Sequence, residues 1–251
     1  MSIKQRRALV TGGAGGIGSA VAARLAATGA SVVIADIDGE RLNAVAADLA
    51  GTDADVEAVE VDVSDRAAVE TMFAAYDGTG GIDILVATAA IVKPAPIIDF
   101  DPDDWARVID INLTGTFHCC QFAARQMVGK GWGRLITISS INGQIANANR
   151  GAYSCTKSGV DQLTRMFANE LGTAGITANV ISPAPVDTPM IKAAHGPKDR
   201  DGWYAGLPIK RYAMPDEVAA AACFLASDDA AYINGHVLNL DGGYMASGLV
   251  G

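Results

Sequence analysis

The stretch Ala8-Leu9-Val10-Thr11-Gly12-Gly13-Ala14-Gly15-Gly16-Ile17-Gly18 decides the fold. Its first four residues form an apolar run typical of a buried strand, and a helical pattern over residues 19–28 follows the glycines. Glycines let the backbone turn tightly and approach a pyrophosphate closely, and free N–H groups at the start of the next helix attract that anion. A strand before and a helix after are the context that a dinucleotide-binding loop requires. We therefore expect a cofactor here, rather than a tight strand-to-helix turn alone.

Beyond this glycine loop (residues 11–18), apolar runs alternate with helical patterns along the chain. Further strands are predicted over residues 31–36, 56–63, 82–88, 134–140, 176–181 and 236–240, and further helices over residues 41–49, 66–76, 105–128, 152–171 and 215–226. Alternation of this kind predicts an α/β Rossmann fold, a doubly wound parallel seven-stranded sheet with helices on both faces. No linker or charge block divides the chain, so we expect residues 1–251 to form a single dinucleotide-binding and catalytic domain.

One long stretch, residues 184–214, has no clear periodicity. It holds Pro185, Pro189, Pro197 and Pro208. Irregular segments of this length in a compact domain are usually functional. We predict irregular structure there and a lid over the substrate.

The charge of the chain limits its partners. The formal net charge is −9, and an acidic surface repels the phosphates of nucleic acids and anionic lipids. No apolar run reaches the roughly 18 residues that span a membrane. The four cysteines, Cys119, Cys120, Cys155 and Cys223, show no metal-binding spacing. We therefore expect no nucleic acid, membrane or metal partner, and a location in the reducing cytoplasm.

Asp36 ends the second predicted strand. A carboxylate at this point accepts hydrogen bonds from the adenosine ribose hydroxyls of NAD and repels the 2′-phosphate of NADP. The nearest basic residue after it is Arg41, which we interpret as a solvated helix charge. We therefore predict NAD as the cofactor, with a simple helix cap as the alternative role of Asp36.

Three polar residues carry the expected chemistry. Ser140 ends a predicted strand, and Tyr153 and Lys157 lie four apart at the start of a predicted helix, so that they share a face. A tyrosine with its ordinary pKa of about 10 is a poor acid/base at neutral pH, and a neighbouring lysine cation lowers that pKa. Ser140 can donate a hydrogen bond to a substrate oxygen on which charge develops.

These residues together resemble the short-chain dehydrogenase/reductase family in its one-domain form, and the resemblance covers essentially the whole chain. The matching motifs are Thr11-Gly12 with Gly16 and Gly18, Asp62-Val63, the group Asn112, Ser140, Tyr153 and Lys157, the segment of residues 179–188, and Asp241-Gly242-Gly243. A literal G-x-G-x-x-G also falls on Gly13, Gly15 and Gly18, and we prefer the register of the family.

The resemblance implies a role for each member of the catalytic group. Tyr153 would shuttle the proton, and Lys157 would bind the nicotinamide ribose and lower the tyrosine pKa. Ser140 would orient the carbonyl or hydroxyl of the substrate. Asn112 would hold a water for a proton relay, and a helix-kinking core amide is the alternative that stays open beside it.

The resemblance also implies the binding residues. The expected cofactor site comprises Gly12, Ala14, Gly15, Gly16, Ile17, Gly18, Asp36, Ile37, Asp62, Val63, Ala87, Ala89, Tyr153, Lys157, Pro183, Val186 and Thr188. The expected substrate contacts are Ser140, Asn142, Tyr153, Pro185, Met190 and Trp203, and the lid residues among them could equally serve packing. Family members are usually tetramers built on two long helices and the C-terminal segment, so we expect a homotetramer.

Two departures from the family pattern bear on the cofactor site. The usual Asn-Asn-Ala-Gly after the fourth strand is Ala87-Thr88-Ala89-Ala90 here, so the amides that stitch the central sheet are missing. The usual Pro-Gly is Pro183-Ala184, which we expect to place an extra methyl near the nicotinamide.

The sequence therefore predicts an NAD(H)-dependent oxidoreductase that moves a hydride between nicotinamide and a secondary alcohol or ketone carbon, with Tyr153 as general acid/base. Apolar and amide side chains mix among the pocket candidates, which suits a substrate such as a polyol or hydroxy acid. A 3-oxoacyl-thioester reductase is an alternative, which Asp36 disfavours because such enzymes usually draw on NADPH. A non-catalytic NAD-sensing protein is another, which the intact catalytic group disfavours.

Overall fold

A computed structural model describes residues 3–50 and 55–247. Seven strands form one sheet in this part of the chain, and every neighbouring pair is parallel. The strands are β1 (Arg7–Thr11), β2 (Ser31–Asp36), β3 (Val56–Glu60), β4 (Ile84–Ala87), β5 (Gly133–Ile138), β6 (Ile176–Pro183) and β7 (Val237–Leu240). Their order across the sheet is β3-β2-β1-β4-β5-β6-β7.

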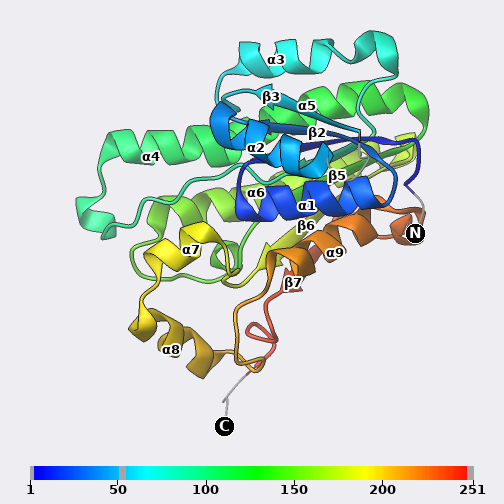
Figure 1. Cartoon of the computed structure of the whole chain (residues 1–251). Helices are drawn as coiled ribbons and strands as arrows, with labels where there is room; N and C mark the ends of the chain where they lie inside the picture. Colours follow the sequence, from blue (N-terminus) through cyan, green and yellow to red (C-terminus); the bar gives the residue numbers. More distant parts are fainter. Residues whose placement is uncertain (1–2, 51–54, 248–251) are drawn as a thin grey trace.

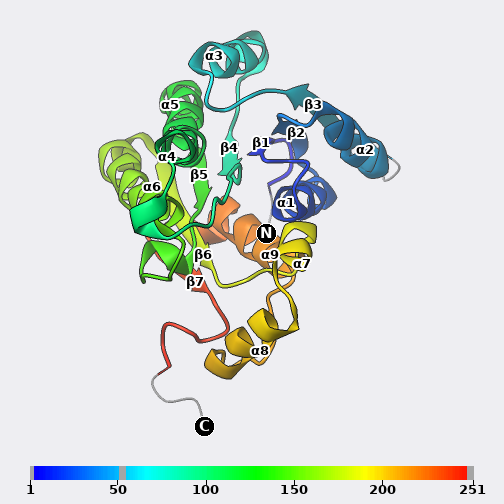
Figure 2. The same cartoon turned by 90° about the vertical axis from the view of Figure 1, so that its left-hand side faces the viewer.

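Helices cover both faces of this sheet (Figures 1 and 2). They are α1 (Gly16–Ala27), α2 (Gly39–Ala50), α3 (Arg66–Ala74), α4 (Pro102–Ile109), α5 (Thr116–Met127), α6 (Gly151–Leu171), α7 (Pro189–Ala194), α8 (Pro197–Gly206) and α9 (Pro215–Ala226). One buried cluster joins the sheet to α1, α2 and α9, and a second joins it to α3, α5 and α6. The predicted doubly wound α/β fold is confirmed.

Alternation along the strands explains why both faces are apolar. Leu9 of β1 belongs to the cluster under α3 and α5, whereas its neighbours Ala8 and Val10 belong to the cluster under α1 and α9. Successive side chains of a strand point to opposite faces, so a strand buried on both faces has no polar side. The continuous apolar runs in the sequence follow from this arrangement.

The strand order places the ligand-binding crevice. After β1 the chain builds β2 and β3 on one side, and it then returns to place β4 on the other side of β1. Ligands of open α/β sheets bind at the carboxyl ends of the strands where the order reverses in this way. The glycine loop leaves β1 at this point, and Figure 2 looks onto this carboxyl edge, with α7 and α8 in the lower part of the view.

The irregular structure predicted for residues 184–214 is wrong in part, because α7 and α8 lie there. Pro189 and Pro197 begin these helices. Proline is tolerated in the first helical turn because the N–H group it lacks would have no partner there, and its fixed φ suits a helix. Thr188 precedes α7, and its hydroxyl oxygen accepts a hydrogen bond from the Ile191 N–H at 3.3 Å. The prolines thus start helices in this segment.

The long helix predicted over residues 105–128 is confirmed with one modification. A π-helical segment, η3 (Asp110–Gly115), joins α4 to α5. Such wider turns occur frequently at functional sites, and η3 contains the fully buried Asn112. No helix in residues 3–50 and 55–247 is long and apolar enough to cross a membrane.

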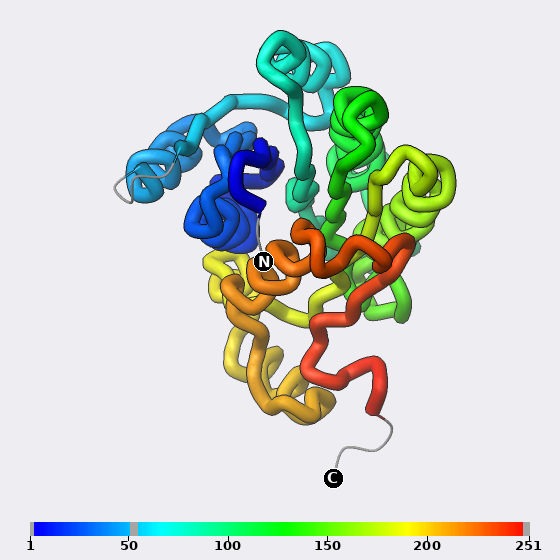
Figure 3. The backbone as a smooth tube through the Cα atoms, turned by 90° about the vertical axis from the view of Figure 1, so that its right-hand side faces the viewer, coloured from blue at the N-terminus to red at the C-terminus, as the bar shows by residue number. Residues whose placement is uncertain are grey.

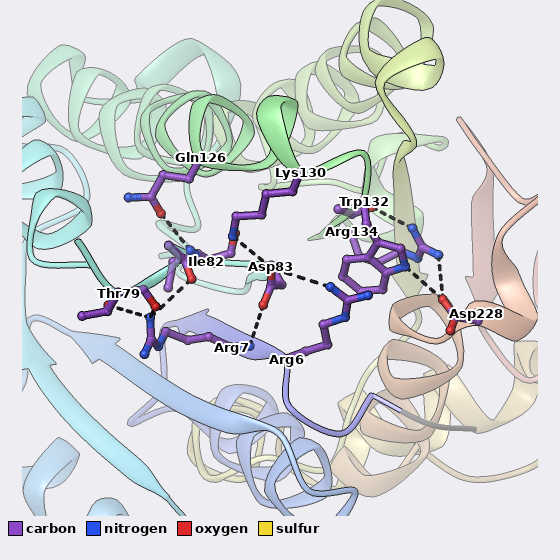
Figure 4. Close-up of polar contacts among 12 residues, drawn as sticks. Arg6, Arg7, Thr79, Ile82, Asp83, Gln126, Lys130, Trp132, Arg134 and Asp228 are labelled. Atoms are coloured by element: carbon purple, nitrogen blue, oxygen red, sulfur yellow. Dashed lines mark hydrogen bonds and ion pairs between the residues drawn. The ribbon is translucent and has the colours of Figure 1, made fainter. Parts of the chain in front are cut away.

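A polar network closes the opposite, amino edge of the sheet (Figures 3 and 4). Asp83, at the start of β4, pairs with Lys130 at 2.9 Å and with Arg6 at 4.0 Å. The Trp132 ring lies between two guanidinium groups, those of Arg6 and Arg134, at 3.9 and 4.3 Å from its centroid. This amino-edge network ties the chain before β1 to β4 and β5.

Candidate active site

The glycine loop can take only glycine at its two ends. Gly12 has φ +68°, and a Cβ there would lie 2.7 Å from the Thr88 hydroxyl oxygen. A Cβ at Gly18 would collide with the Gly12 carbonyl oxygen, so the loop closes on itself. Gly15 precedes α1 without a side-chain cap, which leaves N–H groups of the helix for an anion. The loop therefore fits the pyrophosphate of a nicotinamide cofactor.

The segment after β6 meets the glycine loop from the other side of the crevice. A Cβ at Gly16 would lie 3.0 Å from the Thr188 methyl group. Val186 is buried and its main chain pairs with Ala213, and β6 itself ends at Pro183. The structure thus brings Thr188 to the first turn of α1, beside the expected pyrophosphate position.

Asp36 lies beside the glycine loop. Its carboxylate accepts hydrogen bonds from the Ala14 N–H at 3.0 Å and from the Asp38 N–H at 3.2 Å. Arg41 is an exposed charge on α2, as expected, and its guanidinium also donates to the Ala14 carbonyl at 3.1 Å. The Asp36 carboxylate, which favours NAD, and the Arg41 guanidinium, which favours NADP, therefore flank the same glycine loop.

The adenine end of the expected site lies between β2 and η3. Burial works against the charge of Asp62, but hydrogen bonds from Ser64 and Arg107 outweigh it and hold its pKa below the ordinary value. The carbonyl of Val63 lies 3.3 Å from a ring nitrogen of His118. Ile37 is 58 % exposed, so its side chain is open to a ligand.

The structure brings Ser140, Tyr153 and Lys157 together where β5 ends and α6 begins. The Lys157 ammonium donates to the Ile138 carbonyl at 2.8 Å and lies 5.5 Å from the centroid of the Tyr153 ring. The Ser140 hydroxyl interacts with the Tyr153 phenol in a way that lowers the pKa of the tyrosine. Asn142 joins the group, because its main-chain N–H and side-chain amide both donate to the Ser140 hydroxyl, at 3.2 and 3.3 Å.

The electrostatics of Tyr153 differ from the sequence prediction that Lys157 lowers its pKa. Burial raises the pKa of Tyr153, and it outweighs the opposing effects of the Ser140 hydrogen bond and the Arg150 charge. Burial also lowers the pKa of Lys157 to about 8, against the opposing charge of Asp161. Both shifts arise because a buried group is favoured in its neutral form.

Asn112 uses its side chain inside the protein. Its amide donates to the Ile91 carbonyl at 2.9 Å and to the Thr156 hydroxyl at 3.3 Å, and its side-chain oxygen accepts from the Ile91 N–H at 2.8 Å. The side chain therefore joins η3 to the chain that follows β4. These contacts support the role of a core amide.

The two departures from the family pattern have local explanations. Thr88 stitches β4 to β1 in place of the missing amide, because its hydroxyl donates to the Thr11 carbonyl at 2.6 Å. The Ala184 side chain is buried in a small apolar cluster with Leu207 and Tyr212. The Ala184 methyl therefore packs against the lid segment, and its expected proximity to the nicotinamide stays a prediction.

The remaining expected substrate residues, Pro185, Met190 and Trp203, lie in the lid segment. Trp203 packs against Tyr244, with ring centroids 5.5 Å apart, so it joins the lid segment to the C-terminal segment. Met190 is 58 % exposed, and the Pro185 carbonyl accepts from Ala213. For Trp203 the packing alternative is therefore favoured.

Sequence reasoning missed Arg150 and Asn147. Asn147 donates a short hydrogen bond to the Asn142 side-chain oxygen. Arg150 begins α6, and its charge acts on Tyr153. The position of Arg150 three residues before Tyr153 was the available signal, whereas nothing in the sequence pointed to Asn147.

A chain with this fold and this glycine loop belongs among the nicotinamide-dependent oxidoreductases. Residues 12–245 match the family model described as enoyl-(acyl carrier protein) reductase. The protein is, more specifically, a member of the short-chain dehydrogenase/reductase family, whose oxidoreductases act on CH–OH groups.

Individual relatives cover nearly the whole chain. Cis-4-hydroxycyclohexanecarboxylate dehydrogenase of Sinomonas cyclohexanicum is 42% identical over 96% of this chain and 97% of its own. A 3-oxoacyl-[acyl-carrier-protein] reductase of Thermotoga maritima is 32% identical over 97% of this chain and 99% of its own. A gluconate 5-dehydrogenase from Burkholderia cenocepacia, solved in complex with NADP and tartrate, superimposes with a TM-score of 0.94 at 33% identity, covering 98% of both chains.

Proposed function

We propose that the protein is an NAD(H)-dependent dehydrogenase of secondary alcohols, or reductase of the matching ketones. The observation that carries this proposal is the grouping of Ser140, Tyr153 and Lys157 at the carboxyl edge, next to the glycine loop. The bound nicotinamide supplies or accepts the hydride. The relative that oxidises a hydroxycyclohexane ring supports a secondary alcohol as substrate.

The side chains divide the proton chemistry among them. Asn142 donates twice to the Ser140 oxygen, so the Ser140 proton is left for the Tyr153 phenol or for a substrate oxygen bound beside it. Tyr153 holds its proton at neutral pH because burial raises its pKa, so it is set up as the acid of ketone reduction. Lys157 would bind the nicotinamide ribose, and Asn112 would hold a relay water through its main chain.

Replacing Tyr153 by Phe tests this function. The variant should lose about 10²–10⁴-fold in turnover, the usual contribution of a general acid/base, while NADH binding measured by fluorescence is retained. Turnover that persists in the variant would contradict the mechanism. A wild type that binds NADH but oxidises none of a broad panel of secondary alcohols would favour the nucleotide-sensing alternative.

The choice of NAD rests on Asp36, which occupies the ribose side of the loop. The NADP complex of the gluconate 5-dehydrogenase shows that a similar chain can take the other cofactor. Replacing Asp36 by Ser should shift the ratio of kcat/KM for NAD over NADP toward NADP by about tenfold or more, because removing the carboxylate leaves Arg41 to face the 2′-phosphate. Asp38→Ser removes a neighbouring carboxylate and serves as the control. A wild type that prefers NADP contradicts the proposal.

A 3-oxoacyl-thioester reductase is the second candidate, and the Thermotoga relative favours it. Asp36 disfavours this function, because Asp36 favours NAD and such reductases usually draw on NADPH. Assaying reduction of an acetoacetyl thioester beside a simple ketone, each with NADH and NADPH, separates the two functions.

We also propose that the chain acts as one catalytic domain, with residues 184–214 as its lid, in a cytoplasmic homotetramer. An apolar groove on α5 and α6 supports the assembly, since a second copy could cover it. Its lining residues are Leu113, Thr114, Phe117, Gly159, Gln162, Leu163 and Met166. The four cysteines are free thiols, which suits a reducing compartment.

A further inference from the structure

Arg150 lies at the edge of the candidate active site. It is partly buried and directly precedes α6, three residues before Tyr153. A residue that caps a helix and the third residue of that helix lie on the same side, close enough for their side chains to interact. The main chain of Arg150 pairs with Ala95 in the loop after β4, so its position is fixed by two segments of the site.

Arg150 lies at the start of the catalytic helix, and its charge also reaches the lid. Its positive charge acts on the Tyr153 phenol of α6 and on the His195 imidazole, the residue that ends α7. A ligand lying between Tyr153 and the lid would therefore meet the guanidinium group.

Several cations of this edge pair with a carboxylate, whereas Arg150 pairs with none in the described part of the chain. Arg200 and Lys192 both pair with Asp187, at 3.1 and 3.4 Å. Lys93 pairs with Asp104 at 3.0 Å. Within residues 3–50 and 55–247, no carboxylate lies within 4.0 Å of the Arg150 guanidinium. A partly desolvated charge without a counter-ion is costly, and an anionic ligand would remove that cost.

His195 does not supply a second positive charge. Burial lowers its pKa, and the charges of Arg150 and Arg200 act in the same direction against the opposing charge of Asp199. Its ring is therefore neutral near pH 7, and a hydrogen bond of 2.9 Å between its Nδ1 and the Tyr212 hydroxyl fixes the ring against the lid segment. Arg150 and Arg200 are thus the cations whose charges reach His195, and Arg200 is already paired with Asp187.

We propose that Arg150 binds a carboxylate of the substrate, so that the enzyme acts on hydroxy acids and the matching oxo acids. The inference rests on the proposed dehydrogenase function and names its substrate class. The planar guanidinium binds a carboxylate with two parallel hydrogen bonds. Anchored in this way, the substrate would present its carbinol carbon to Tyr153 and Ser140, and its fixed orientation would favour the reaction.

The test compares acids with their neutral esters. The probes are 3-hydroxybutyrate and cis-4-hydroxycyclohexanecarboxylate, each beside its methyl ester, which keeps the alcohol and lacks the charge. The quantity measured is the ratio of kcat/KM for acid over ester, in wild type, Arg150→Gln and Arg150→Lys. Arg165→Gln removes the same charge from the exposed face of α6 and is the matched control.

We expect wild type to prefer at least one acid over its ester. Arg150→Gln should lower that ratio about tenfold or more, mainly through KM, because truncating one partner of a charge pair weakens binding by at least this factor. Arg150→Lys should restore part of the ratio, and Arg165→Gln should leave it as in wild type. A wild type that oxidises the esters as well as the acids, or an Arg150→Gln variant that loses both equally, overturns the proposal.

A binding measurement separates this inference from the proposed function. The same acids, added with NADH, should raise the Tm of wild type more than that of Arg150→Gln, whether or not any alcohol is oxidised. If wild type oxidises neutral alcohols with NAD but no acid shifts its Tm, the function stands and the role of Arg150 falls. If acids shift the Tm without turnover, the carboxylate site stands and the proposed function falls.

Discussion

Two asparagines, Asn142 and Asn147, orient the Ser140 hydroxyl. The Ser140 oxygen accepts both the main-chain N–H and the side-chain amide of Asn142, and Asn147 in turn holds the Asn142 side-chain oxygen. A hydroxyl oxygen with two donors directed at it keeps its own proton for a third partner. Asn142 is therefore a positioning residue, and Asn147 fixes the rotamer that it needs.

Replacing Asn142 by Ala should lower kcat about tenfold, because one of the two donors that orient Ser140 is lost. Asn147→Ala should lower it less, since the Asn142 amide is loosened and still present. A purely structural role predicts a lower Tm with kcat unchanged in the surviving enzyme, which would contradict the assignment. Steady-state kinetics beside thermal denaturation distinguishes the two outcomes.

The titration of Tyr153 should lie above that of an ordinary tyrosine. Burial favours the neutral phenol, so the phenolate forms only above the ordinary pKa of about 10. Because the Tyr153 phenolate is the base that takes the alcohol proton, the rate of alcohol oxidation should rise with pH. The groups facing this phenol are Ser140, Arg150 and Lys157. The difference in phenolate absorbance between wild type and Tyr153→Phe reports this pKa.

Removing the Arg150 charge should move that titration further upward, because a cation stabilises the phenolate. Arg165→Gln should leave it in place. A wild-type Tyr153 that titrates well below 10 in the free protein would show that burial is not the dominant effect.

At the residue scale, local spacing was enough to find Ser140, Tyr153 and Lys157 as a group. Arg150 was not predicted as functional because its lack of a partner is a property of the folded molecule. The substitution of Thr88 for an amide was visible in the sequence, but its hydroxyl contact with Thr11 depends on how β4 lies beside β1.

At the scale of elements, one hydroxyl adds to the ladder that joins β1 to β4. Thr88 donates to the Thr11 carbonyl at 2.6 Å, and the two strands pair through four residues each. The lid segment shows the limit of sequence reasoning at this scale. Proline indicates a break when it lies inside a helix and a start when it lies in the first turn, and only the neighbouring contacts distinguish the two.

Replacing Thr88 by Val keeps the shape and removes the hydroxyl. We expect the free energy of unfolding to fall by about 0.5–1.5 kcal/mol, because the Thr11 carbonyl loses the hydroxyl and keeps only the Thr88 main-chain N–H at 3.3 Å. Thr71→Val, which removes a hydroxyl from the exposed face of α3, should change it by less than about 0.5 kcal/mol. Urea denaturation measures both. Equal losses in the two variants would show that the β1–β4 contact has no special weight.

At the scale of the whole molecule, alternating apolar runs predicted the doubly wound sheet correctly. No single segment of the sequence predicts that β4 lies beside β1. This strand order was expected only from the resemblance to a family. The apolar groove on α5 and α6 could not be read from the sequence either, because the same residues would suit a buried core face.

Replacing Met166 by Glu should reduce the mass of the assembly measured by light scattering. Met166 lines the groove and is 45 % exposed, so a carboxylate there would be desolvated by a second copy. Ile98→Glu changes a residue that is 89 % exposed on the loop before α4 and should leave the mass unchanged. A wild type that is monomeric, or a Met166→Glu variant of unchanged mass, contradicts the proposed tetramer contact.

The amino-edge network affects which mutations the fold can tolerate. Asp83, Arg6, Lys130 and Trp132 hold the strands together at the edge that lies away from the candidate site. The residues that meet substrate lie at the other end of the same strands. Mutations in the candidate site that change substrate specificity therefore fall outside the amino-edge network. Changes in the lid segment therefore leave this anchor in place, and the same sheet can support different substrate sites.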